Sequence, residues 1–118
     1  IEEGFIVAEM EGSIVGFVVI TTHMAYPWWD RKVKSWCEIV ELHVHHELWR
    51  KGIGTELVKE AKEYAKSKGV EAIYVMTGKD NISARKLYEK CGFKEYEHRV
   101  SYKLTLKNKK KFRQFQSY

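Results

Sequence analysis

The middle of the chain predicts a strand, a helix and another strand in direct succession. Residues 36–45 predict a strand, whose two faces would carry Glu38, Val40, Leu42 and Val44 on one side and Ile39, Glu41, His43 and His45 on the other. From residue 51 to residue 68 the apolar side chains recur at helical spacing, and residues 72–77 are again rich in strand-forming side chains. Such a unit implies two parallel strands joined by a right-handed crossover. The chain is therefore expected to form an α/β fold.

A β-hairpin is expected before this unit. Residues 5–10 and 14–22 favour two strands, and the Glu-Gly-Ser at 11–13 between them is typical of a turn. Residues 23–35 contain the chain's only proline beside two tryptophans, and we expect a long loop there. The tryptophans either pack or form a lid or wall of a binding site.

A second helix is expected after the unit. Gly69 is a natural end for the first helix, Asp80 or Asn81 can cap the next one, and Gly92 can end it. Residues 93–107 alternate loosely and predict one or two further strands. The expected fold is a mixed sheet flanked by helices, with the hairpin first.

Composition predicts one domain and a basic tail. The chain has 118 residues with 44% hydrophobic content, and no apolar run approaches the roughly 18 residues of a membrane span. Residues 1–106 are expected to be one domain and residues 107–118 a tail. The net charge is +5, and the tail holds five cations and no acid, so the rest is formally neutral. We expect a cytoplasmic protein with no membrane partner, and a solvated tail is preferred to the alternative of a nucleic-acid partner bound by that tail.

Neither a disulfide nor a metal site is expected. Cys37 and Cys91 have no metal-ligand spacing and lie beside apolar residues, so they are predicted to be buried free thiols. His43, His45 and His46 resemble a metal cluster, but nothing nearby in the sequence completes one. Surface or cleft histidines are the preferred interpretation.

The entry to the first helix combines cations with glycines. A helix N-terminus carries partial positive charge and favours acidic residues, yet Arg50 and Lys51 stand here with Gly52 and Gly54. Glycines expose backbone N–H groups, so this arrangement is typical of an anion site, with phosphate as the first candidate. A plain strand-to-helix turn is the alternative. The spacing is that of neither a Walker A loop nor a dinucleotide fingerprint.

Two blocks of sequence carry a family resemblance. The run from Glu41 to Val58, which contains this turn, resembles the signature of the GNAT superfamily of N-acetyltransferases. Residues 81–93 resemble that family's second conserved block, in the right order and spacing. The resemblance covers residues 5–106 and implies transfer of an acetyl group from acetyl-CoA to a primary amine by direct attack. It also implies that the helices which usually precede the hairpin are absent here.

The resemblance implies a role for each part of the site. The amides from Arg50 to Thr55 would bind the CoA pyrophosphate, and the strand backbone near Val44 would pair with the pantetheine arm and supply an oxyanion donor. Asn81 would contact pantetheine, and Tyr88 would protonate the leaving thiolate. Trp49 stands where the family pattern has Gln or Arg. The expected cofactor-binding residues are Leu42, His43, Val44, Trp49, Arg50, Lys51, Gly52, Ile53, Gly54, Thr55, Asn81, Ala84 and Tyr88.

A general base is also needed, because an amine with a pKa near 10.4 is ammonium at neutral pH. Glu41 and Glu38 are the candidates, on opposite faces of a regular strand unless a bulge intervenes, and Glu41 is preferred. The acceptor amine is on a small molecule or, alternatively, on a protein N-terminus or lysine. A second alternative is an acyl-CoA-binding module without catalysis. The expected partners are acetyl-CoA, the amine and a second copy in a homodimer.

Overall fold

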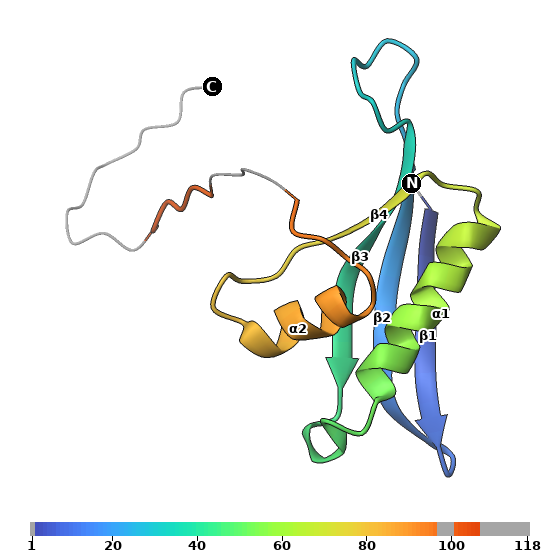
Figure 1. Ribbon diagram of the computed structural model, residues 1–118, viewed down its shortest axis with the longest axis vertical. Helices are drawn as coiled ribbons and strands as arrows, with labels where there is room; N and C mark the ends of the chain where they lie inside the picture. The colour runs from blue at the N-terminus through green and yellow to red at the C-terminus, as the bar shows by residue number, and fades with distance from the viewer. Residues whose placement is uncertain (1, 97–100, 107–118) are drawn as a thin grey trace, which may run out of the picture.

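The computed structural model describes residues 2–96 and 101–106. In these residues a four-stranded sheet in the order β1-β2-β3-β4 packs with helices α1 and α2 (Figure 1). The elements are β1 (Glu2–Met10), β2 (Ser13–Met24), β3 (Ser35–Val44), the 3-10 helix η1 (His46–Leu48), α1 (Ile53–Ser67), β4 (Ala72–Val75) and α2 (Ile82–Lys90).

The sheet is mixed, as the sequence predicts. β1 pairs with β2 and β2 with β3 in antiparallel fashion, whereas β3 and β4 are parallel and are joined through α1. The hairpin turn places Glu11 at φ 50° and Gly12 at φ 80°, the left-handed pair that matches the twist of two antiparallel strands. The expected α/β class, the leading hairpin and the central strand-helix-strand unit are confirmed.

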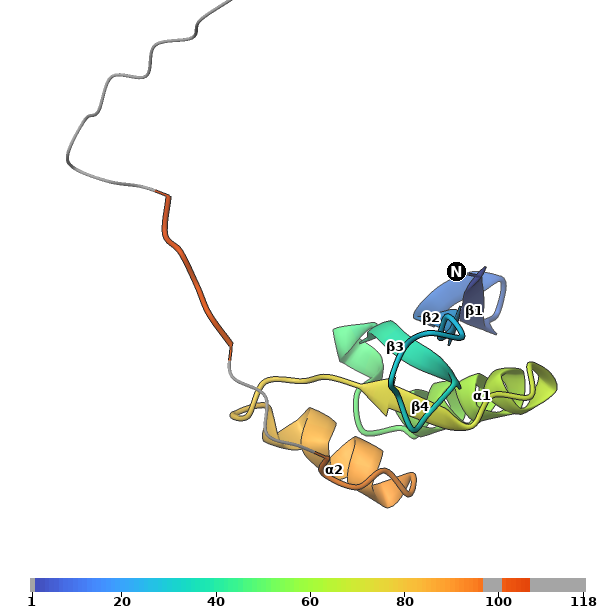
Figure 2. The ribbon, with the colours of Figure 1, turned by 90° about the horizontal axis from the view of Figure 1, so that it is seen from above.

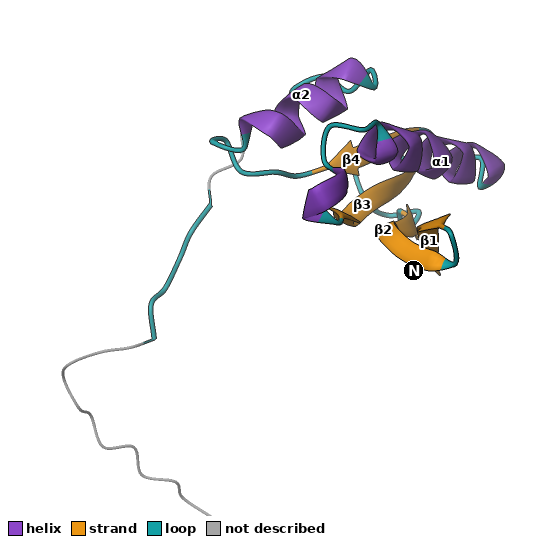
Figure 3. Ribbon diagram, turned by 90° about the horizontal axis from the view of Figure 1, so that it is seen from below, coloured by secondary structure: helices purple, strands orange, loops and turns teal. Residues whose placement is uncertain are grey.

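One face of the sheet is covered by α1. Figures 2 and 3, which look along the strands, show this helix lying beside the sheet. Apolar side chains recur at helical spacing along α1 and at every second residue along the inward face of β2 and β3, so each element has one apolar face. The apolar face of α1 packs against those of β2 and β3. The buried cluster consists of Val18, Ile20, Cys37, Ile39, Ile53, Leu57, Ala61 and Ala65. None of the described helices is both long enough and apolar enough to cross a membrane.

The opposite face carries a row of rings across three strands. Phe5 of β1 lies 5.3 Å from Phe17 of β2, and Phe17 stacks on His43 of β3 at 5.4 Å between centroids. Phe5 remains 64% exposed. This face therefore has apolar character, and no helix among the described residues covers it as α1 covers the other face.

The helix ends follow the expected capping chemistry. Gly69 adopts φ 68° after the last residue and C-cap of α1, and Gly92 adopts φ 95° at the same position after α2, a conformation that glycine reaches without steric cost. Asn81 caps α2, because its side-chain oxygen accepts from the Ala84 amide at 3.1 Å. Asp80, the alternative cap, does not have this role. α1 begins at Ile53, two residues later than expected.

The loop between β2 and β3 is shorter than expected, since both strands extend into residues 23–35. Residues 25–34 form the projection at the top of Figure 1. Tyr26 stacks on Trp28 at 4.7 Å and meets Trp29 edge-on at 5.0 Å. The guanidinium of Arg31 lies 4.0 Å from the centre of the Trp36 ring, which holds the loop against the start of β3.

The strands predicted between residues 93 and 107 are absent from the described parts of that range, 93–96 and 101–106. Alternation supplies one apolar face, but a strand is stable only when that face packs and its edge pairs. The side chains of Tyr102, Leu104 and Leu106 are 92%, 83% and 87% exposed, so they contribute little burial. Residues 97–100 and the whole predicted tail, 107–118, lie outside the described residues.

Candidate functional site

Strands β3 and β4 separate part-way along their length. Their pairing runs only from Trp36 opposite Ala72 to Ile39 opposite Val75. β3 continues to Val44, whereas the chain after β4 turns away towards α2 (Figure 1). In the described part of the chain, the edge of β3 beyond residue 39 therefore has no partner strand on this side.

The backbone groups on this open edge follow from the pairing on the other edge. The His45 amide donates to the Val15 carbonyl of β2 at 2.8 Å. Because backbone groups alternate between the two edges of a strand, those of Leu42 and Val44 face the open edge. The Val44 carbonyl accepts from the indole Nε1 of Trp49 at 2.7 Å. The N–H and C=O of Leu42 and the N–H of Val44 are thus presented for a ligand.

A β-bulge at Val40 changes the register of β3. Ile39 lies opposite Ile20 and Glu41 opposite Val19, so Val40 is the extra residue between them. Glu38, opposite Thr21, therefore shares a face with Glu41. The expectation of opposite faces is wrong, because the bulge adds one residue between Glu38 and Glu41 and so brings both side chains to the same face.

The turn before α1 presents a run of unpaired amides. Arg50 adopts φ 66° and Gly52 φ 85°, and both values lie in the left-handed region. Among the described residues, no group accepts from an amide at positions 50–55; the bond from the Glu56 amide to the Gly52 carbonyl, at 3.0 Å, is the first of the helix. Lys51 and Arg50 precede the helix instead of lying within its first turn, and both are exposed.

A cleft of about 1380 Å³ opens beside the point where β3 and β4 separate. Residues of β3, β4, α2 and the segment after α2 line this cleft. They include Glu38, Tyr74, Arg85, Tyr88 and Phe93. Glu38 is half-buried there, whereas Glu41 is exposed and does not line the cleft. The cleft thus brings two of the three predicted catalytic residues, Glu38 and Tyr88, to one cavity.

Tyr88 is the titratable side chain of the cleft with a shifted pKa. Burial raises the pKa of its hydroxyl above the ordinary 10.0, and the nearby Cys91 sulfur adds to the rise. The Phe93 ring meets the Tyr88 ring edge-on at 5.7 Å, and the Phe93 amide donates to the Tyr88 carbonyl at 2.9 Å. Tyr88 is therefore protonated at neutral pH and can act as a proton donor.

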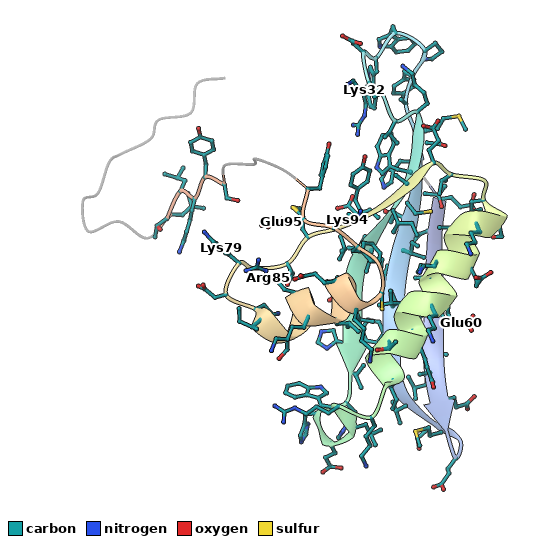
Figure 4. The ribbon with its side chains drawn as sticks, viewed as in Figure 1. Lys32, Glu60, Lys79, Arg85, Lys94 and Glu95 are labelled. Carbon is teal, nitrogen blue, oxygen red and sulfur yellow. The ribbon has the colours of Figure 1, made fainter. Side chains whose placement is uncertain are left out.

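The loop before α2 is fixed by Arg85, a residue that the sequence analysis does not single out. Its guanidinium donates to the Lys79 carbonyl at 3.1 Å and lies 4.0 Å from the Glu95 carboxylate (Figure 4). The only sequence signal is position, since Arg85 lies one helical turn before Tyr88. Asn81, at the end of this loop, uses its oxygen as the helix cap and keeps its NH₂ for other partners.

The histidines make local contacts. His45 and His46 stack at 4.7 Å, and the Nδ1 of His45 accepts from the Glu47 amide at 3.3 Å. Within the described residues, no three His, Cys, Asp or Glu side chains gather closely enough to hold a metal ion. The absence of a metal stays a prediction. Of the two free thiols, Cys37 is buried as expected, but Cys91 is only half-buried at the exposed end of α2.

Comparison with known families gives a match over most of the chain. The model of the acetyltransferase (GNAT) family matches residues 2–93. An uncharacterized N-acetyltransferase of Methanocaldococcus jannaschii is 36% identical over 96 residues, which is 81% of this chain and 41% of the relative. One of Archaeoglobus fulgidus is 36% identical over 87 residues, 74% of this chain and 57% of the relative. The chain therefore spans about half the length of these two relatives.

Solved structures show the same fold at lower identity. A mutant of the BH1408 protein of Bacillus halodurans superposes with a TM-score of 0.79 at 20% identity, over 88% of this chain and 67% of that one. AAC(6′)-Iy, in complex with the bisubstrate analogue CoA-S-monomethyl-acetylneamine, gives 0.75 at 18% identity, over 88% and 70%. At these identities the likeness extends to the fold alone.

Proposed function

We propose a reaction for this chain from one premise: the chain belongs to the acetyltransferase (GNAT) family, whose model matches residues 2–93. The proposed activity is transfer of the acetyl group of acetyl-CoA to a primary amine by direct attack. The observation that carries it is the run of unpaired amides at residues 50–55, which begins a few residues beyond the open edge of β3.

The turn fits a pyrophosphate. Unpaired amides at a helix N-terminus point towards a common site, and the helix dipole adds positive potential there. Successive residues that alternate into the left-handed region, here Arg50 and Gly52, form a concave set of N–H donors that favours anions. The side chains of Arg50 and Lys51 add two positive charges beside it.

The open edge of β3 fits an extended arm that carries amides. Leu42 offers both an acceptor and a donor, and Val44 offers its N–H, so the arm can pair as an additional strand would. Acetyl-CoA supplies a thioester with a carbonyl carbon open to attack. In the proposed reaction the Val44 N–H donates to that carbonyl oxygen as negative charge develops on it.

A carboxylate on β3 accepts the proton that the acceptor amine must lose. Glu38 and Glu41 share a face, so both can reach the same side of the sheet. The cleft favours Glu38, because it lines the cavity that also holds Tyr88.

Tyr88 supplies the proton that the departing thiolate requires. Its hydroxyl is half-buried on α2 and protonated at neutral pH, and a thiolate is a moderate base that accepts such a proton. Asn81 caps the same helix with its side-chain oxygen, so its NH₂ is left for a contact with pantetheine.

An amine is the proposed acceptor class. The bisubstrate analogue bound to AAC(6′)-Iy joins CoA to acetylneamine, which supports amine chemistry on this fold. A small molecule and a protein amine fit the reaction equally, so both belong in the substrate panel.

The test is thiol release from acetyl-CoA in the presence of an amine panel: spermidine, an aminosugar, free lysine and a peptide with a free N-terminus. We expect at least one amine to raise thiol release well above the rate without an acceptor. Release that no amine changes, together with tight acetyl-CoA binding, would instead support a binding module without catalysis. Failure to bind acetyl-CoA at all would overturn the proposal.

A further inference from the structure

We propose that Trp49 is a positioning residue for the turn at residues 50–55: its indole N–H, bound to the Val44 carbonyl, holds the amides of that turn in their ligand-ready arrangement. The inference rests on the proposed function, since it concerns the same pyrophosphate site. It assigns the role to a hydrogen bond within the protein and not to a contact with the ligand.

The bond closes the segment between the strand and the turn. Val44 is the last residue of β3, and Trp49 follows η1, so the 2.7 Å contact ties the strand end directly to the residue before the turn. Two backbone hydrogen bonds stabilise the segment between them. The Leu48 amide donates to the His45 carbonyl at 2.8 Å, and the Trp49 amide donates to the His46 carbonyl at 3.3 Å. The indole bond is the shortest of the three.

Burial does not explain the position of the ring. Trp49 is 64% exposed, so little apolar surface holds it in place. An indole has a single N–H donor and no acceptor, and the Val44 carbonyl already takes that donor. Trp49 therefore cannot donate to a phosphate in this arrangement, and its contribution to binding is the geometry of the turn.

The residue that follows needs such support. Arg50 adopts φ 66°, a backbone conformation that is unfavourable for residues other than glycine and persists only where the surrounding structure imposes it. Residue 49 is extended, at φ −63° and ψ 148°, and the indole bond fixes it. The direction of the Arg50 amide follows from these two residues, and the amides of Lys51 and Gly52 follow from Arg50.

The experiment compares Trp49→Phe, which keeps a ring but removes the N–H, with Trp28→Phe as a matched control. Trp28 is 74% exposed in the loop at residues 25–34, away from the turn. Two quantities are measured: hydrogen exchange of the ligand-free chain at the hydrogen-bonded amides of residues 45, 47, 48 and 49, and the Kd for acetyl-CoA by calorimetry. Melting temperatures accompany both.

For Trp49→Phe we expect faster exchange confined to these four amides, and a Kd raised about threefold to tenfold, the range set by the net strength of one hydrogen bond. Trp28→Phe should leave both unchanged. Unchanged exchange at these four amides would overturn the positioning role whether or not acetyl-CoA binds. So would faster exchange throughout the chain with a large loss of melting temperature, which would mark a general structural role. If the unmutated chain does not bind acetyl-CoA, the proposed function fails, and the exchange result still decides the role of Trp49.

Discussion

Glu38 and Glu41 project from the same face of β3, although residues three apart on a regular strand lie on opposite faces. The bulge at Val40 is the cause, since it leaves that residue without a partner on β2. The two carboxylates differ in their surroundings, because Glu38 is half-buried in the cleft and Glu41 is exposed. The bulge thus presents two candidate bases to one side of the sheet and the cleft distinguishes them.

Replacement of Glu38 by Gln should lower kcat more than replacement of Glu41 by Gln. A positioned general base contributes about 10²–10⁴-fold to a rate, and we expect the Glu38→Gln loss to fall in this range. Steady-state kinetics with the best amine of the panel measures both. Glu60→Gln, on the exposed side of α1 (Figure 4), is the control and should change nothing. A larger loss for Glu41→Gln would instead identify Glu41, the residue favoured by the sequence, as the general base.

Tyr88→Phe should reduce turnover with little effect on acetyl-CoA affinity, because only the proton donor is removed. The expected loss in kcat is about 100-fold or more, as for other general acids. Tyr102→Phe, at a position 92% exposed, is the control. Equal turnover of the Tyr88→Phe variant and the unmutated chain would remove the assigned role.

The pH dependence of the rate gives a separate test of Tyr88. A general acid works only while protonated, so activity falls as pH rises through its pKa. Since burial raises the pKa of Tyr88 above 10.0, the alkaline limb of kcat should lie above pH 10.0. A Tyr88-dependent limb below that value would contradict the assignment. In the Tyr88→Phe variant the limb should disappear.

Gly52→Ala should weaken acetyl-CoA binding through the backbone alone. An added Cβ at Gly52 meets nothing within 4 Å, but its φ of 85° lies where an L side chain costs about 1–2 kcal/mol. We expect a Kd raised about tenfold, since 1.4 kcal/mol corresponds to that factor. Gly52→Asn should cost less, because Asn tolerates this region better. Calorimetry on both variants decides, and equal losses would point to a steric cause instead.

Gly16→Ala should destabilise the fold through a backbone clash. The added Cβ would lie 2.8 Å from the His43 carbonyl oxygen, and a backbone atom in a paired strand cannot move away cheaply. We expect a loss of about 1–3 kcal/mol in the free energy of unfolding, as for other overpacked sites. The control is Gly78→Ala, where a Cβ meets nothing within 4 Å and φ is not positive. Urea denaturation of the two variants measures the difference, and equal stabilities would show that β2 and β3 relax freely at this point.

The regular part of the fold is predictable from the sequence because its signals are local. The stripe of apolar residues on α1 determines that helix and the face it buries, and the β-branched run at residues 14–22 determines a strand. The cap at Asn81 and the glycine ends at Gly69 and Gly92 also depend on only a few neighbouring residues. Each of these predictions is confirmed.

The parts that depend on distant partners are not predictable in the same way. The bulge at Val40 exists only in the register between β2 and β3, and alternation along β3 alone conceals it. Similarly, the alternation of Tyr102, Leu104 and Leu106 does not indicate whether another part of the fold packs against these side chains. The hydrogen bond from the Trp49 indole N–H to the Val44 carbonyl is a contact that no pattern of residues in the sequence predicts. The roles predicted for the site residues stay predictions until they are measured.

The most direct test of the account is a titration of the ¹⁵N-labelled chain with CoA, followed by the backbone amide resonances. We predict saturable shifts for the amides at residues 50–55 and for those of Leu42 and Val44, with little change at residues 25–34. These are the unpaired N–H groups of the turn and of the open edge of β3. The absence of shifts at submillimolar CoA, or shifts confined to other parts of the chain, would contradict the assignment of this turn as the pyrophosphate site.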